Sequence, residues 1–103
     1  MRTIRSKEFT AERAWGSLPI ANFSGTTVKL HWTDAPYRWH VNDGQEVFAV
    51  MDGVVNMHFK HEGVEEMVVL AAGDIFYANL GTEHVAHPQG AARVLVIERE
   101  GSV

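Results

Sequence analysis

The sequence predicts an all-β fold, an antiparallel sandwich or small barrel built from short strands. After about residue 25, turn signals recur roughly every eight to twelve residues, a spacing typical of such folds. The runs between these turns are rich in β-branched and aromatic residues, which favour strands. Helical periodicity is almost absent from the 103 residues. These observations indicate one β domain over residues 1–103, with the barrel at about residues 25–100.

The chain is expected to begin with an arm that precedes the barrel. This arm covers residues 1–14, and a short helical turn is expected where it ends, over residues 10–15. Thr10 can cap such a turn, and Gly16 can end it.

The strands are expected to follow one another without a linker or an internal repeat. Asp52-Gly53 separates two of them and predicts a two-residue hairpin. Pro36 marks a break before a short strand. Strands are expected at residues 26–32, 37–40, 46–51, 54–60, 65–70, 75–79 and 92–98.

Two of these strands are apolar on both faces, namely residues 47–51 and 94–97. A sheet with one face in water alternates apolar and polar residues more cleanly. A second covering layer is therefore expected, and another copy of the chain is the simplest one. The sequence thus predicts a homodimer.

Composition and charge exclude several classes of protein. The chain has no cysteine, which removes thiol nucleophiles, thiolate zinc sites and disulfide frameworks and fits a cytoplasmic protein. No run of apolar residues reaches the length of a transmembrane helix, so no membrane partner is expected. Residues 1–14 carry four bases and two acids, and the rest carries five bases and eleven acids. Because nucleic-acid binding needs a basic face, no nucleic-acid partner is expected for this acidic body.

Chemistry-bearing residues gather in two short segments. In the first, His40 and Asn42 are two apart and would share a face of an extended strand. The turn that follows reverses the chain, and Glu46 opens the next strand beside them. In the second, Gly81 permits a tight bend that directs His84 back at the sheet. Two imidazoles and one carboxylate form the ligand set of a common type of divalent-metal site.

The spacing of these segments resembles the paired motifs of the cupin superfamily. His40, Glu46 and Gly53 match the first motif, Gly-(X)5-His-X-His-(X)3–4-Glu-(X)6-Gly, in identity and spacing. The second motif, Gly-(X)5-Pro-X-Gly-(X)2-His-(X)3-Asn, is matched at Gly73, Gly81 and His84. The resemblance covers about residues 15–100 and implies a double-stranded β-helix, or jelly-roll, barrel of antiparallel strands with a metal ion or small ligand inside it.

Carried over position by position, the resemblance implies four metal ligands: His40, Asn42, Glu46 and His84. Asn42 stands where the family has a second histidine, and its carbonyl oxygen is a weaker donor for a transition metal than imidazole. The sequence also departs from the motifs in that Asp34, Asn79 and Pro88 replace a glycine, a proline and an asparagine.

Two states of this site follow from the residues. In the first, His40, Glu46 and His84 hold a divalent ion such as Fe, Mn, Ni or Zn, with positions left for water and substrate. In the second, the same residues form a hydrogen-bonded polar cluster, in which the carboxylate favours the charged imidazoles.

The resemblance leads to two functional interpretations. The first is a metal-binding protein that acts on or binds a small organic molecule by dioxygenase, isomerase or lyase chemistry, with Glu46 moving a proton. The alternative is a metal-free small-molecule-binding or sensory protein without catalysis.

The remaining candidates are assigned by strand alternation. Phe48 and Val50 share the face of Glu46 and are expected to form the pocket wall. His87 is expected to face outward, but it is also a second candidate for the ligand position at which Asn42 replaces a histidine. His58 and His61 are expected in solvent, and His31 is left between the barrel interior and a dimer partner.

Overall fold

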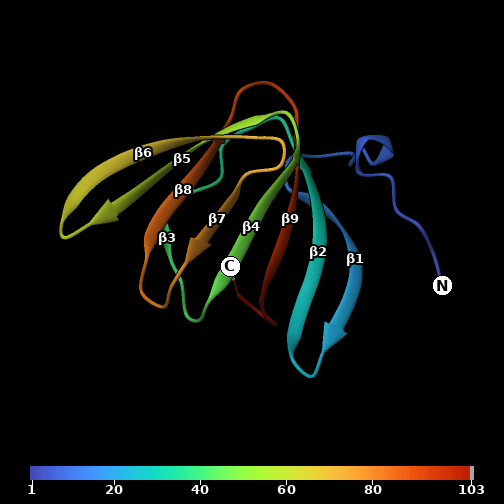
Figure 1. Cartoon of the computed structure of the whole chain (residues 1–103), viewed down its shortest axis with the longest axis horizontal. Coiled ribbons are helices and arrows are strands. Elements are labelled where there is room, and N and C mark those ends of the chain that lie inside the picture. Colours follow the sequence, from blue (N-terminus) through green and yellow to red (C-terminus); the bar gives the residue numbers. More distant parts are fainter. Residues whose placement is uncertain (103) are drawn as a thin grey trace.

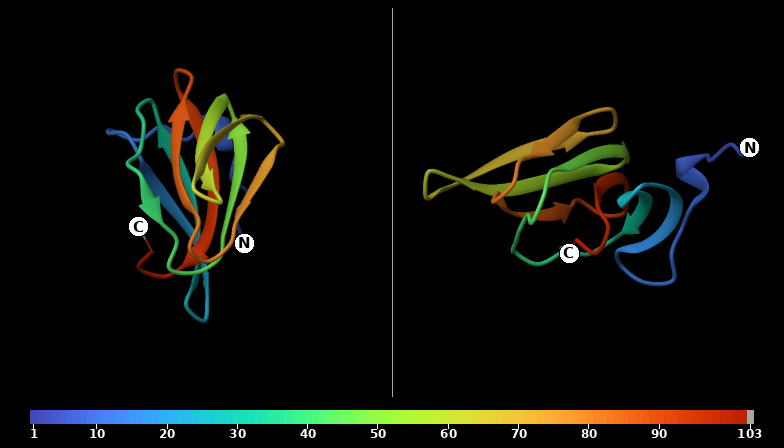
Figure 2. Two further views of the ribbon diagram at one scale, coloured as in Figure 1. Left: turned by 90° about the vertical axis from the view of Figure 1, so that its left-hand side faces the viewer. Right: turned by 90° about the horizontal axis from the view of Figure 1, so that it is seen from below.

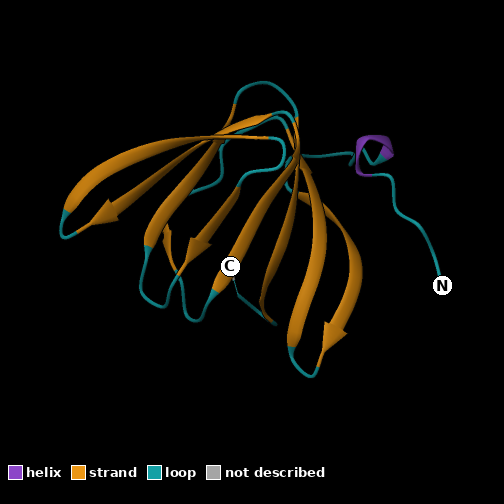
Figure 3. Cartoon of the chain, viewed as in Figure 1, coloured by secondary structure: helices purple, strands orange, loops and turns teal. Residues whose placement is uncertain are grey.

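A computed structural model describes residues 1–102 as two antiparallel sheets that pack face to face (Figures 1 and 3). The five-stranded sheet has the order β1-β2-β9-β4-β7, and the four-stranded sheet has the order β3-β8-β5-β6. The strands are β1 (Gly16–Phe23), β2 (Thr26–Thr33), β3 (His40–Val41), β4 (Glu46–Asp52), β5 (Val54–His61), β6 (Val64–Ala71), β7 (Ile75–Ala78), β8 (Glu83–Pro88) and β9 (Ala92–Arg99). The predicted all-β antiparallel fold is confirmed. No helix in residues 1–102 is long and apolar enough to cross a membrane.

Two strands are present that the sequence pattern did not predict. One is β1, which lies at the edge of the five-stranded sheet and has a register shift between Pro19 and Ala21. An edge strand tolerates proline because one side of the strand makes no backbone hydrogen bonds, so the missing N–H of proline is not needed there. Since proline usually argues against a strand, Pro19 prevented this strand from being predicted. The other is β8, a short strand in which His84, Val85 and Ala86 are all buried, so no alternation marks it.

The segment between Pro36 and the first motif is mostly loop. Residues 37–40 were expected to be a strand, but only His40 lies in one, in the two-residue β3. The backbone N–H of Tyr37 donates to the carbonyl of Ala86, so the loop is nevertheless held beside β8.

The helical turn of the arm lies earlier than expected. It is a 3-10 helix at Ser6–Glu8, and residues 10–15 form bends and turns instead. Trp15 has a φ of 62°, in the left-handed region that a helix excludes. Its indole N–H donates to the carbonyl of Ala35 at 2.9 Å, so attachment to the barrel replaces helix formation at this point.

The arm runs outside the barrel (Figure 2), and its 3-10 helix lies against β4. A guanidinium N–H of Arg2 donates to the carbonyl of Pro19 at 2.7 Å. Arg93 donates to the carbonyl of Phe9 at 2.8 Å and pairs with Asp52 at 2.7 Å. These contacts fasten the arm to the five-stranded sheet.

The turn at Asp52-Gly53 is a corner and not a hairpin. It joins β4, in the five-stranded sheet, to β5, in the four-stranded sheet, and these strands do not pair. The predicted hairpin is therefore wrong, although the turn itself is present. Gly53 has a φ of 82°, and a Cβ there would lie 2.5 Å from the carbonyl oxygen of Ala91. The sequence signal gives the tight turn but not which sheet the chain enters next.

The hydrophobic core fills the space between the two sheets. Its inward residues alternate along β4, β5 and β9, as expected for strands with one face in a core. The buried members are Phe48, Val50, Val55, Met57, Leu70, Ala86, Ala92, Val94 and Val96. This core leaves one end of the sandwich to polar residues, which make up the site described below.

We predict that Gly53→Ala destabilises the fold more than Gly63→Ala. Both glycines have a positive φ, where an alanine costs about 1–2 kcal/mol. Only at Gly53 does the added Cβ also strike backbone, since nothing lies within 4 Å of it at Gly63. Urea unfolding of both variants measures the difference. Equal losses of unfolding free energy would contradict the close corner.

Candidate metal centre

The two predicted motifs meet at the polar end of the sandwich. His40 on β3 lies directly across from His84 on β8, and their ring centroids are 4.2 Å apart. Glu46 reaches them from β4 in the opposite sheet, with its Oε1 2.8 Å from His84 Nε2. Ligand atoms of all three residues lie within 4.8 Å of one another. The predicted convergence of two imidazoles and one carboxylate is present in the structure.

The backbone fixes which nitrogen of each imidazole faces the site. His40 Nδ1 lies 3.0 Å from the carbonyl of Arg38, and His84 Nδ1 lies 3.1 Å from the carbonyl of Thr82. A carbonyl only accepts hydrogen bonds, so both Nδ1 atoms carry hydrogen. Each Nε2 is then the atom turned toward the carboxylate. Histidine ligands of metals are oriented in the same way, by a carbonyl that accepts the hydrogen bond of the ring nitrogen that does not bind the metal.

The contact between His84 and Glu46 holds one proton. His84 is 2% exposed and Glu46 is 7% exposed, so water does not separate them. Since Nδ1 is already protonated, the 2.8 Å contact from Nε2 to Oε1 needs one further proton between the two groups. A metal ion at this point would take the place of that proton.

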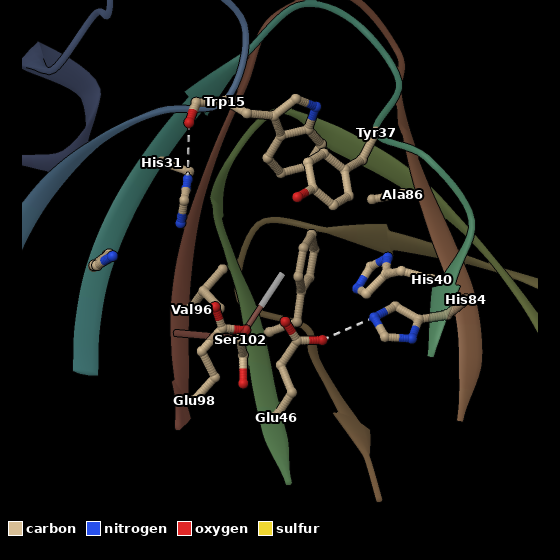
Figure 4. Close-up of a pocket in the computed structure, with 12 residues that line it drawn as sticks. Trp15, His31, Tyr37, His40, Glu46, His84, Ala86, Val96, Glu98 and Ser102 are labelled. Atoms are coloured by element: carbon tan, nitrogen blue, oxygen red, sulfur yellow. Dashed lines mark hydrogen bonds and ion pairs between the residues drawn. The ribbon is translucent and has the colours of Figure 1, made fainter. Parts of the chain in front are cut away.

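A second carboxyl group, which the sequence did not single out, touches Glu46. Glu98 on β9 pairs directly with Glu46 in the sheet, and Figure 4 shows Glu46 between Glu98 and His84. Burial, the hydrogen bond to Glu46 and repulsion by its charge raise the pKa of Glu98 to about 8. Glu98 is therefore protonated at neutral pH and donates to the Glu46 carboxylate.

The surroundings keep Glu46 ionised and His40 neutral. Burial raises the pKa of Glu46, but hydrogen bonds from His84 and Glu98 outweigh it and bring this pKa below its usual value. Burial lowers the pKa of His40, although its hydrogen bond to the Arg38 carbonyl opposes the shift. A carboxylate and a neutral imidazole are the ligand forms that a metal needs. The expected charging of both imidazoles by the carboxylate does not hold for His40.

A cavity of about 150 Å³ opens beside the three residues. Phe48 lines it, as predicted, whereas Val50 is fully buried in the core and does not. Aromatic rings close the other end, where Trp15 meets Tyr37 edge to face with centroids 5.2 Å apart (Figure 4). The cavity is lined by Trp15, Lys29, His31, Tyr37, His40, Glu46, Phe48, His84, Ala86, Val96, Glu98 and Ser102.

The sequence left the position of His31 open, and in the structure its side chain lines the cavity. Its Nδ1–H donates to the carbonyl of Trp15 at 3.2 Å, and burial lowers the pKa of His31. The sequence pattern did not place Trp15, Lys29 and Ser102 in the site, because they come from the turn before β1, from β2 and from the last residues that the structure describes. Strand alternation alone places Glu98 on the face of Val96, but only the β4–β9 pairing brings it to Glu46.

The other residues that the sequence singled out, Asn42, His58, His61 and His87, do not belong to the group of three ligands. Asn42 is buried nearby, and its amide nitrogen donates to the carbonyl of Ala78 at 3.2 Å. His87 faces outward from β8, as expected, and its ring lies 4.7 Å from that of His58. His61 is exposed, whereas His58 is half-buried and not fully in solvent.

The donor set can hold a divalent ion. Two imidazole nitrogens and one carboxylate oxygen leave further coordination positions open and suit divalent first-row metals such as Fe²⁺. The residues therefore fit the ion that the motif spacing implies. Without an ion, the same residues satisfy one another, because residues 1–102 contain no buried side-chain polar atom without a partner.

Comparison of structures finds proteins that are similar to this chain. No protein-family profile and no curated protein matches it in sequence. A cupin-2 domain protein from Shewanella frigidimarina is 25% identical, with 87% of this chain and 85% of that chain covered and a TM-score of 0.77. A cupin superfamily protein from Desulfitobacterium hafniense is 13% identical, with 91% and 85% covered and a TM-score of 0.77. A hydroquinone 1,2-dioxygenase in complex with Cd²⁺ and 4-hydroxybenzonitrile is 16% identical, with 93% and 69% covered and a TM-score of 0.74.

Fold and site together define a small β-sandwich protein with two histidines and one glutamate converging at its open end. The chain has the cupin fold, and the resemblance seen in the two motifs is confirmed.

We predict that the metal-free protein loses stability as the pH rises from about 6.5 to 9, above the range in which His31 and His40 titrate, and that Glu98→Gln loses less. The pKa of Glu98 is raised from 4.5 in the unfolded chain to about 8, so the folded chain holds an extra proton in this range. Stability must then fall as pH rises through the range. Glutamine keeps a hydrogen-bond donor to Glu46 but does not titrate. Urea unfolding across this range, with metal chelated, would refute the assignment if both proteins followed the same curve.

Proposed function

We propose that this protein binds one divalent metal ion through His40, Glu46 and His84. The observation that carries the proposal is that their ligand atoms lie within 4.8 Å of one another, with both Nε2 atoms turned inward by backbone carbonyls. The proposed ion is Fe, Mn, Ni or Zn, which this donor set suits. The Cd²⁺ in the structurally similar dioxygenase supports a divalent ion.

We further propose that the cavity binds a small organic molecule on which the protein acts. Its volume of about 150 Å³ limits the ligand to roughly the size of a single ring. Trp15, Tyr37 and Phe48 provide the apolar wall that would orient such a ring. The 4-hydroxybenzonitrile bound to the dioxygenase is of this size and supports the assignment. The proposed reaction belongs to the dioxygenase, isomerase or lyase type.

When bound, the ion would supply Lewis-acid or redox chemistry at the open coordination positions. The chain's own residues would prepare the site. Protonated Glu98 donates a hydrogen bond to Glu46 and keeps that carboxylate aligned, and Glu46 stays ionised and able to accept a proton from a ligand. The buried surroundings of Glu46 and His84 would exclude water from that side.

The alternative function is that of a metal-free small-molecule-binding or sensory protein. One observation favours it: Glu46 already has partners in His84 and Glu98, so the site is satisfied without an ion. In that case the two carboxyl groups and Lys29 would bind polar groups of the ligand directly.

We also propose that the protein acts as a cytoplasmic homodimer. The outer face of the five-stranded sheet supports the dimer, since Met51, Ile75 and Tyr77 on β4 and β7 are 41%, 66% and 54% exposed. Apolar side chains that are gathered on one outer face mark an interaction surface.

We predict that His40→Ala abolishes metal binding at the centre while leaving the fold intact. His40 is half-buried and is not part of the Glu46–His84 contact, so its loss removes a ligand without leaving that buried pair unpartnered. His84→Ala is expected to lose the metal too, but with a large loss of stability because it strands a buried carboxylate. His61→Ala, at an exposed histidine, is the control. Elemental analysis after dialysis against Mn²⁺ or Fe²⁺ provides the measurement, and unchanged content in both site variants would remove the proposal.

We predict that Asn42→His tightens metal binding at least about tenfold, equivalent to ~1.4 kcal/mol. The substitution replaces a weak amide donor with an imidazole at the position where the motif has its second histidine. Competition with a chelator of known affinity measures the change. Unaltered affinity would mean that residue 42 faces Ala78 alone and is not a ligand position.

A further inference from the structure

Two histidines that the centre does not use lie together on the opposite face of the four-stranded sheet. His58 on β5 and His87 on β8 have ring centroids 4.7 Å apart, with their planes inclined by 53°. This separation is close to the 4.2 Å between His40 and His84. Because His84 and His87 are three residues apart on one strand, they must face opposite sides of the sheet.

The neighbouring strands add further donor groups to this outer face. A carboxylate oxygen of Glu65 on β6 lies 3.5 Å from His58 Nδ1. Met67 is directly opposite His58 in the β5–β6 pairing and so shares its face. His58 thus has a carboxylate close to it and a methionine on the same face of the sheet, and carboxylate and thioether groups can both bind metal ions.

The nearest cation does not oppose a metal ion here. Lys60 lies on the same face as His58, two residues further along β5. Its ammonium pairs with Glu83 at 3.3 Å and lies over the ring of Trp39, 5.4 Å from the centroid. Its charge is therefore balanced by Glu83 and directed away from the histidine pair.

The histidine pair stands on a covered part of the sheet. Val85, directly opposite His58 and on the same outward face, is only 2% exposed, so side chains close over it. The His58 side chain is 26% exposed, and His87 is also half-buried. Partial burial restricts both imidazoles, so little side-chain entropy remains to be lost when they bind an ion.

We propose that His58 and His87 form a second metal site, with Glu65 as the third ligand and water in the remaining positions. It would take a divalent ion late in the Irving–Williams order, Cu²⁺ or Zn²⁺, because imidazole is the preferred ligand of both. The Glu65 side chain is 57% exposed and free to rotate toward the ion. Unlike the centre, whose ligand atoms already lie within 4.8 Å, this site closes only on binding. The proposal does not depend on the proposed function, since the two sites share no ligand.

Isothermal titration with Cu²⁺ tests the proposal, together with the electron paramagnetic resonance spectrum of the bound ion. Wild type is expected to bind two ions, and His40→Ala one. In the His40→Ala protein, adding His87→Ala or His58→Ala should weaken the remaining Cu²⁺ at least tenfold and remove its nitrogen hyperfine pattern. His61→Ala, which changes an exposed histidine outside the cluster, should leave both ions bound. Circular dichroism confirms that each variant is folded.

The outcomes separate the two sites. If His87→Ala and His58→Ala leave the number of ions and the spectrum unchanged, or if His61→Ala has an equal effect, the second site is refuted. If wild type binds a single ion that His87→Ala removes and His40→Ala does not, the second site stands and the proposed centre fails. If wild type binds a single ion that His40→Ala removes and His87→Ala does not, the proposed centre stands and the second site is refuted.

Discussion

The arrangement of the candidate metal centre depends on one hydrogen bond, from His84 Nε2 to Glu46 Oε1 at 2.8 Å. It joins the two sheets at the end where the hydrophobic core stops, and both residues are almost completely buried. A buried pair of this kind contributes little net stability, but removing one partner costs several kcal/mol. The other two groups of the site, Glu98 and His40, lie on either side of this hydrogen bond. Glu98 hydrogen-bonds to the carboxylate from the neighbouring strand β9, and the His40 ring lies against the His84 ring from β3, inclined to it by 57°.

This contact explains why one donor set is compatible with two states. Without an ion, a proton lies between the imidazole and the carboxylate, and the site is satisfied. With an ion, the same two atoms become ligands, and His40, whose pKa burial lowers, contributes a neutral imidazole. The two functional interpretations therefore differ only in whether a metal ion or a proton lies between His84 and Glu46, and both are compatible with the same fold.

Most of the strands and three residues of the site could be predicted from the sequence, because the patterns that indicate them are local. Turn residues and β-branched runs mark most strands, and fixed motif spacing marks His40, Glu46 and His84. What the sequence could not give depends on pairing between distant strands. Glu98 reaches Glu46 only through the β4–β9 register, and Trp15 is held at the cavity by a hydrogen bond to the distant carbonyl of Ala35. The same limitation applies to Asp52-Gly53, where a turn signal does not say which sheet the chain enters next.

The most direct test of the account is a crystal structure of the protein grown with Zn²⁺ or Mn²⁺, with anomalous diffraction recorded at the absorption edge of the ion. The account predicts one strong anomalous peak between the sheets, about 2.0–2.2 Å from the Nε2 atoms of His40 and His84 and from a carboxylate oxygen of Glu46. A structure at saturating metal without a peak at this point, and with the His84–Glu46 hydrogen bond intact, would contradict it.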